Sequence, residues 1–182
     1  MMSTASETVP EDLSAARERI AAAYEPRLLE EAGHRLAGLL AAHLARAERS
    51  EGSVLPWTDP PEAVREASTL LKSSPAAGES VPDGFVRLVT AMLQRGLNLH
   101  DPRYIGHQVP ASVPLAGLFD AVGSVTNQVM AIYEMGPWAT AVELAMIQEL
   151  GTIIGWEPGA FAGSVTHGGS LANLTGLLTA RN

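Results

Sequence analysis

A lone candidate β-strand is the feature that most constrains what this sequence can fold into. Residues 161–166 have the length and composition of a strand, whereas helical patterns fill most of the remaining chain. A single strand cannot bury both of its faces, and a parallel sheet needs several strands. We therefore expect stable folding to require association with further polypeptide that completes the sheet.

Two helical segments are expected before residue 50. Pro26 separates two runs in which apolar or small residues recur at helical spacing. The pair offers a wide Ala/Leu face without partner elements of its own in the sequence, so its burial must come from another domain or another subunit. The simplest interpretation is a helical packing hairpin. The two runs are formed by Leu13, Ala16, Ile20 and Ala23, and by Leu29, Leu36, Leu40 and Leu44.

Loops and shorter helices alternate along the rest of the chain. Proline and glycine mark loops at residues 52–61 and 73–82, and residues 100–114 form a long irregular stretch of the kind that often carries binding residues. No internal repeat accompanies them. The expected helices are Glu62–Leu71, Asp83–Gln94 ended by Gly96, one capped at its start by Ser112, one beginning near Gly136-Pro137, and Leu171–Arg181.

The composition excludes several classes of function. The 182 residues are 46% hydrophobic, enough to form a core, and a formal charge of −8 with only 12 basic residues supplies no cationic stripe for nucleic acid. Cysteine is absent, which rules out disulfides, thiolate catalysis and Cys-based zinc sites. The sequence shows no signal peptide and no run of about 18 apolar residues. We therefore expect a soluble, cytoplasmic protein without a metal site that binds neither nucleic acid nor membrane.

The strongest chemical signal is the turn His167-Gly168-Gly169-Ser170 between the candidate strand and the last helix. Glycines let the backbone turn sharply and approach a ligand, and the free N–H groups of a helix's first turn favour an anion such as phosphate. The serine adds a hydroxyl donor. The spacing is neither that of a Walker loop nor that of a dinucleotide-binding loop. From spacing alone, a Gly-Gly-Ser turn that caps a helix is more often plain chain reversal than a phosphate site.

Four patches of the sequence, taken together, resemble one enzyme family. Ser164–Arg181 is similar to the phosphate-binding strand-turn-helix of the group II decarboxylases that depend on pyridoxal phosphate (PLP), such as glutamate, aromatic amino-acid, histidine and diaminobutyrate decarboxylases. Asp101–Pro110 resembles their substrate loop, Tyr133–Glu143 the start of a helix that follows it, and Leu150–Trp156 the next segment. The patches occur in the family's order, and the resemblance covers roughly residues 83–182.

The resemblance implies roles for particular residues. Gly168, Gly169 and Ser170 would hold the phosphate of the cofactor, pyridoxal 5'-phosphate, through backbone N–H groups and the serine hydroxyl. His107 and Gln108 fall where the family's substrate loop meets the substrate, which makes them candidates for substrate binding and specificity. The alternative for these two is a loop histidine and glutamine that make local hydrogen bonds.

Other polar residues of the matching patches are assigned supporting roles. Thr140 and Glu143 lie on the helix that in the family packs near the active-site mouth and dimer contact, and we expect them to be structural. His167 stands where relatives often carry Ser, Thr or Pro, and we expect it to lie behind the residues that touch the cofactor. His100 and Asp101 are not expected to form a catalytic pair, because sequence neighbours seldom point together and no nucleophile elbow is present.

The catalytic lysine of PLP chemistry is missing from these 182 residues. A lysine must hold the cofactor as a Schiff base, and the one lysine here, Lys72, precedes the matching region and is expected on the surface. In the family that lysine, the carboxylate facing the pyridine nitrogen and the histidine stacked on the ring all come later in the chain. The last helix also runs out without a capping glycine. We therefore expect a fragment with no catalytic residue of its own.

The implied architecture is α/β, that of the fold-type I, aspartate aminotransferase-like PLP enzymes. Residues 1–110 are expected to form a helical segment for packing and dimerisation, and residues 111–182 to begin the PLP-binding large domain with its first strand and helices. The implied function is decarboxylation of an amino acid to an amine, in a homodimer with the rest of the enzyme. The alternatives are another fold-type I PLP enzyme, such as a carbon–carbon lyase or aminotransferase, and a non-catalytic helical interaction module.

Overall fold

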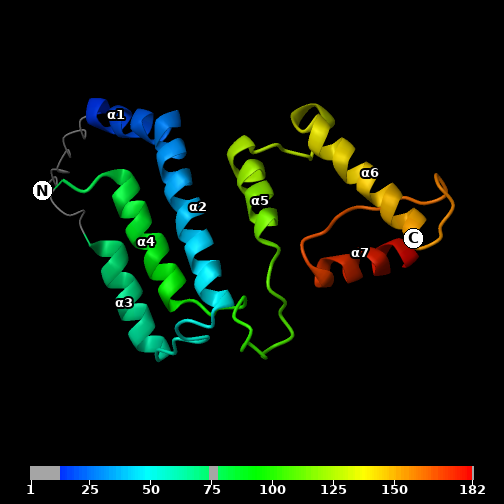
Figure 1. The fold of residues 1–182 in the computed structure, drawn as a ribbon. Helices are drawn as coiled ribbons and strands as arrows, with labels where there is room; N and C mark the ends of the chain where they lie inside the picture. Colours follow the sequence, from blue (N-terminus) through cyan, green and yellow to red (C-terminus); the bar gives the residue numbers. More distant parts are fainter. Residues whose placement is uncertain (1–12, 74–77, 182) are drawn as a thin grey trace, which may run out of the picture. The chain divides into compact units, whose positions relative to one another are not determined.

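The structure is a computed structural model that describes residues 13–73 and 78–181. In this part of the chain the ordered elements are all helical (Figure 1). The chain divides into two compact units, Met1–Ser112 and Val113–Asn182. The first unit contains α1 (Leu13–Ala23), α2 (Pro26–Glu48), α3 (Pro60–Lys72) and α4 (Val81–Arg95), and the second contains α5 (Pro114–Thr126), the short 3-10 helix η1 (Tyr133–Met135), α6 (Pro137–Ile153) and α7 (Gly169–Arg181).

The first unit is organised around the packing of α2 on α4, which lie side by side in Figure 1. The buried apolar residues are small, Ala47 near the end of α2 and Ala91 on α4. Small side chains let two helix backbones approach closely, whereas the leucines that line α1 and α2 stay partly exposed. Both helices expected before residue 50 are present, but the expected packing hairpin is not: α2 packs on α4, and no comparable contact joins α1 to α2 within the described residues.

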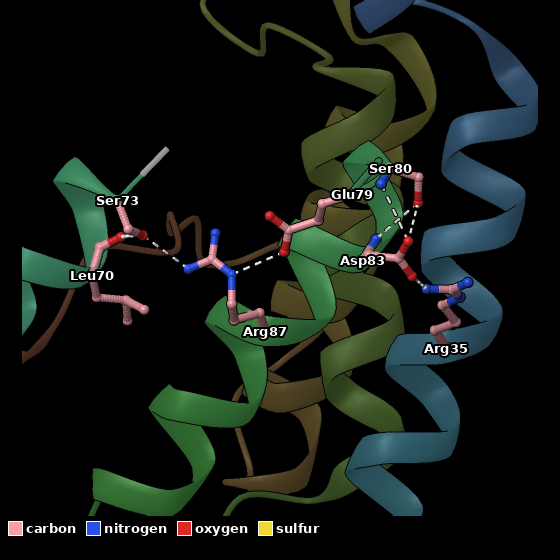
Figure 2. Close-up of polar contacts among 7 residues, drawn as sticks. All are labelled: Arg35, Leu70, Ser73, Glu79, Ser80, Asp83 and Arg87. Atoms are coloured by element: carbon pink, nitrogen blue, oxygen red, sulfur yellow. Dashed lines mark hydrogen bonds and ion pairs between the residues drawn. The ribbon is translucent and has the colours of Figure 1, made fainter. Parts of the chain in front are cut away.

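The first turn of α4 is fixed by a capping box that also reaches α2 (Figure 2). The Ser80 hydroxyl accepts a hydrogen bond from the Asp83 N–H, and the Asp83 carboxylate accepts one from the Ser80 N–H. The same carboxylate lies 2.6 Å from Nη1 of Arg35 on α2. The Arg35 guanidinium, followed by the bonds from Ser80, lowers the pKa of Asp83 to about 2. One side chain thus caps α4 and ties it to α2.

Two arginines on α4 connect it to its sequence neighbours. Arg87 donates from Nε to the Glu79 carboxylate at 3.0 Å and from Nη1 to the Ser73 hydroxyl, which in turn donates to the carbonyl of Leu70 in the last turn of α3 (Figure 2). At the C-terminal end of α4, Nε of Arg95 forms an ion pair with the Glu66 carboxylate of α3 at 2.9 Å. These side-chain bonds link α3 to α4.

The second unit has little core of its own. Within residues 113–181 the buried residues are Gly136 and Gly151. The leucine, valine and phenylalanine side chains of α5 and α7 are between 42% and 72% exposed. Such apolar helix faces are stable in water only when something covers them. The helices themselves end as their sequence dictates: Asn127 adopts the left-handed conformation that terminates α5.

Two local expectations from the sequence are corrected, and the end of α4 at Gly96 is confirmed. Residues 161–166 do not form a strand, because no neighbouring strand within the described chain offers ladder hydrogen bonds. Ser112 is not the cap of α5, which begins after Val113, and its carbonyl instead accepts a hydrogen bond from His100 Nε2 at 3.0 Å. Gly96 does end α4, but with a φ of −78° rather than in the left-handed conformation. The fold class and the roles expected for the two parts stay predictions.

Candidate functional site

The turn before α7 leaves the start of the helix open. Gly168 has a φ of +80°, a conformation that favours glycine, and its carbonyl accepts the first helical bond, from the Ala172 N–H at 3.3 Å. A Cβ added at Gly168 or Gly169 would meet no atom within 4 Å. The approach to the start of α7 is therefore open on the side of both glycines.

The groups at this helix start are donors. The first N–H groups of a helix, here those of Gly169, Ser170 and Leu171, have no acceptor inside the helix, and the helix dipole adds a partial positive charge. Gly168, Gly169 and Ser170 are all exposed, so these N–H groups and the serine hydroxyl are reachable from solvent. His167 is exposed as well. The turn fits a phosphate or carboxylate group.

The segment that leads into the turn packs on α6 instead of joining a sheet. The ring of Phe161 lies so close to Gly151 that a Cβ at that position would be 2.0 Å from the Phe161 Cζ atom. The Phe161 ring also contacts Trp156, with ring centroids 5.3 Å apart and planes inclined by 57°. Gly151 is therefore required for the close approach of Phe161 to the helix.

Nearer the turn, the same segment is held by a carboxylate. Oε1 of Glu143 on α6 accepts a hydrogen bond from the backbone N–H of Val165 at 2.7 Å. Gln148, one turn further along α6, accepts a weaker bond from the Gly159 N–H at 3.4 Å. Glu143 was expected to be structural, and this contact shows what it holds.

The loop expected to meet the substrate is anchored by an arginine that the sequence did not single out. The Asp101 side chain is fully buried and accepts hydrogen bonds from the backbone N–H, Nε and Nη2 of Arg103. Nη2 of Arg103 also donates to the Gly52 carbonyl, and the Asn98 N–H donates to the Val54 carbonyl at 2.9 Å. Arg103 lowers the pKa of Asp101 to about 2. The spacing Asp-x-Arg was the available signal for this anchor.

His107 and Gln108 sit at the exposed tip of that anchored loop. Both have positive φ angles, 40° and 52°, although neither is glycine or asparagine. The preceding Gly106 leaves room for the ring of Tyr104, whose atoms would lie 3.1 to 3.3 Å from a Cβ there. The Tyr104 hydroxyl is buried without a hydrogen-bond partner among the described residues. Backbone strain of this kind clusters at functional sites.

The histidines close to the loop take separate roles. His100 is bonded to the Ser112 carbonyl, while the Asp101 carboxylate is occupied by Arg103, so the structure shows no His–Asp pair at this position. His43 on α2 is partly buried, and this burial, followed by the charges of Arg46 and His100, lowers its pKa. Neither arrangement is that of a catalytic base with its orienting carboxylate.

Two further residues from the sequence analysis can be placed. Lys72 is the last residue of α3 and is exposed, as expected, although it lies in the helix and not in a loop. The Thr140 hydroxyl in the first turn of α6 is buried and has no hydrogen-bond partner within the described chain. Lys72, His107 and Gln108 belong to the first unit, and the turn at 168–170 belongs to the second.

Neither a cluster of metal ligands nor a membrane-spanning helix occurs among the described residues. In residues 13–73 and 78–181 no group of three or more His, Cys, Asp or Glu side chains is placed to hold a metal ion. No helix in the same ranges is long and apolar enough to cross a membrane.

The known proteins that are similar to this chain include two amino-acid decarboxylases. An L-2,4-diaminobutyrate decarboxylase of Acinetobacter baumannii is 26% identical over 121 residues, which cover 66% of this chain and 24% of that enzyme. An L-aspartate decarboxylase of Metarhizium robertsii is 25% identical over 124 residues, covering 68% of this chain and 24% of the relative. No family model and no solved structure matches the chain.

These matches support a distant relationship between this chain and amino-acid decarboxylases. The aligned region accounts for 24% of the length of each relative. The chain thus spans about a quarter of the curated enzymes it matches.

Proposed function

We propose that this chain forms part of a PLP-dependent amino-acid decarboxylase of the group II family and supplies its cofactor-phosphate turn. The observation that carries the proposal is the start of α7, where Gly168 adopts a φ of +80° and leaves the helix N-terminus open to an anion. The similarity to two amino-acid decarboxylases supports the same reaction class. Fold type I, a homodimer and a cytoplasmic location belong to this proposal.

The residues of the turn fit the phosphate of PLP. The N–H groups that open α7 and the Ser170 hydroxyl are exposed donors, and neither Gly168 nor Gly169 carries a side chain that would block a phosphate. When bound, PLP supplies the electron sink for the bond between Cα and the departing carboxylate of the amino acid. The turn holds the phosphate and so fixes the position of the cofactor.

The loop of the first unit would orient the amino acid. We assign His107 and Gln108 to contact with the substrate side chain or carboxylate, in the role that the resemblance implies. Both side chains are exposed at the loop tip, and the bonds of Arg103 to the buried Asp101 carboxylate anchor the loop. Fixed donors and acceptors of this kind orient the scissile bond, which is where the protein contributes to catalysis.

The lysine of the reaction must come from polypeptide outside these 182 residues, because Lys72 is exposed on α3 and lies before the matching region. Three quarters of each relative's length has no counterpart here, which leaves room for that lysine. The apolar faces of α5 and α7 would be covered in the assembled enzyme.

Binding of a cofactor analogue tests the proposal directly. Pyridoxine 5'-phosphate carries the phosphate of PLP but no aldehyde, so it cannot react with Lys72. We expect equilibrium dialysis to show that the chain retains pyridoxine 5'-phosphate and does not retain pyridoxine. Gly169→Glu places a negative charge at the turn and should abolish retention, whereas Gly176→Glu, in the middle of the same helix, should not.

Equal retention of the two compounds, or unchanged retention by the Gly169→Glu variant, would contradict phosphate binding and favour a non-catalytic interaction module. The reaction itself is measured on the assembled enzyme as release of CO₂ from L-2,4-diaminobutyrate and L-aspartate, the substrates named by the two relatives. Amino transfer or carbon–carbon cleavage without CO₂ release would instead indicate another fold-type I enzyme.

A further inference from the structure

We infer that Glu143 is a positioning residue that sets where the N–H groups of the phosphate turn lie. The identity of the ligand rests on the proposed function. The positioning role of Glu143 rests on the connection between α6 and the turn. The Glu143 carboxylate holds the Val165 N–H at 2.7 Å, three residues before Gly168. Among the described residues it is the hydrogen bond to α6 that lies nearest to the turn.

The contact is the last of three at regular intervals. Along α6 the contacts fall at every fourth residue, and along the incoming segment at every second residue. They join Gly151 to Phe161, Ile147 to Gly163, and Glu143 to Val165. Four helical residues rise about 6.0 Å, and two residues of extended chain span about 6.6 Å, so the two repeats match closely. The segment therefore runs antiparallel to α6 in one register.

The register is specified at each contact by a different kind of fit. At Gly151 the absence of a side chain admits the Phe161 ring. At Gly163 a Cβ would lie 3.2 Å from Cγ2 of Ile147, so a glycine suits this position too. Neither contact has a directional bond. The Glu143 carboxylate adds one, because a charged acceptor fixes both the distance and the direction of the Val165 N–H.

A shift of two residues along the segment would move the turn by about 6.6 Å. The N–H groups of the turn would then no longer face the phosphate. A hydrogen bond to a charged group shifts the equilibrium between the bonded and the unbonded conformation by roughly tenfold or more. Glu143 thus acts on the ligand through Val165 and the turn, without touching the ligand itself.

Amide resonances provide a test that needs no ligand. In ¹⁵N-labelled 182-residue chain, Glu143→Ala should shift the amide signals of Val165 and of residues 168–170 and should speed hydrogen exchange at Val165 by about tenfold. Glu143→Gln retains a carbonyl acceptor and should restore most of both effects. Glu149→Ala removes another carboxylate of α6, one with no hydrogen bond or ion pair in the described residues, and should leave these signals unchanged.

Affinity for pyridoxine 5'-phosphate adds the functional readout. We expect Glu143→Ala to weaken it about tenfold, with Glu143→Gln in between and Glu149→Ala unchanged. Unaltered amide signals at 168–170 in Glu143→Ala would overturn the inference, whatever the ligand does. Altered amide signals in a chain that never binds the phosphate would uphold the positioning role and contradict the proposed function.

Discussion

The ring of Phe161 occupies the space where Gly151 would carry a side chain, with its Cζ atom 2.0 Å from the place of a Cβ. Helix α6 and the segment before the phosphate turn are therefore fitted to one another at a glycine. Since the unit has few other buried residues, this contact is a sensitive point for its stability.

The first prediction concerns this contact. Gly151→Ala should destabilise the second unit by about 1–3 kcal/mol, because the new methyl group forces Phe161 away from α6. Loss of the Trp156–Phe161 ring contact should appear as a change in near-ultraviolet circular dichroism, and urea denaturation gives the free energy of unfolding.

The matched control is Gly176→Ala in α7, where a Cβ meets nothing within 4 Å. Alanine is the better helix former, so this variant should gain about 0.5–1 kcal/mol. Equal behaviour of the two variants would mean that the Phe161 contact does not limit stability.

A second prediction separates strain from function at the loop tip. His107→Gly and Gln108→Gly should each raise the free energy of unfolding by up to about 1 kcal/mol, because glycine adopts a positive φ without steric cost. The same variants should lower kcat/KM of the assembled enzyme if these side chains meet the substrate. A variant with higher stability and full activity would remove that residue from the substrate site.

Arg103 should not be replaceable by lysine. Its planar guanidinium reaches the Asp101 carboxylate through Nε and Nη2 and the Gly52 carbonyl through Nη2, a fork that a lysine ammonium cannot reproduce. Arg103→Lys should therefore speed hydrogen exchange at the Asn98 amide, which bonds across the same loops.

Arg65→Lys is the comparison for this variant, since the Arg65 side chain is exposed on α3 and makes no ion pair within the described ranges. Exchange at Asn98 that is equally slow in both variants would show that a single positive charge suffices.

The fourth prediction is a loss of stability in acid. The pKa of Asp83 lies at about 2 in the folded chain, below its usual value of 3.8, so between these two pH values the unfolded chain binds more protons. The contribution of this carboxylate is full above about pH 4 and disappears as the pH falls through about 2. Urea denaturation of the wild-type chain between pH 5 and pH 2 measures the slope.

Asp83→Asn should have lower stability at pH 5 and a flatter decline towards pH 2 than the wild type. Asp120→Asn on α5 changes an exposed carboxylate that makes no ion pair or hydrogen bond in the described chain, and its decline should match that of the wild type. A decline that is unchanged in Asp83→Asn would mean that Arg35 and Ser80 do not stabilise the carboxylate.

The helices could largely be predicted from the sequence, because their signals are local. Pro26, Pro137 and the apolar spacing of α2 each mark a helix within a few residues. The strand could not, because a strand depends on a neighbour that pairs with it, and periodicity says nothing about whether a neighbour exists. Residues 161–166 keep close to α6 instead.

The candidate site could likewise be predicted from the sequence only in part. The glycines of the turn are visible in the sequence, and Gly168 does take the positive φ that suits such a turn. The bond from Val165 to Glu143 joins residues 22 positions apart, and no glycine marks the left-handed angles at His107 and Gln108 in the sequence. Phosphate binding and substrate binding themselves stay predictions.

The register between α6 and residues 161–165 also limits the length of that segment. Between neighbouring contacts, the rise of the helix and the length of the extended chain differ by about 0.6 Å. The difference adds up to about 1.2 Å at the third contact and would exceed a quarter of the spacing between contacts after one or two more contacts. A longer segment would fall out of phase with the helix. The hydrogen bond at Val165 lies within the range where the two periods still coincide, and the chain turns at Gly168.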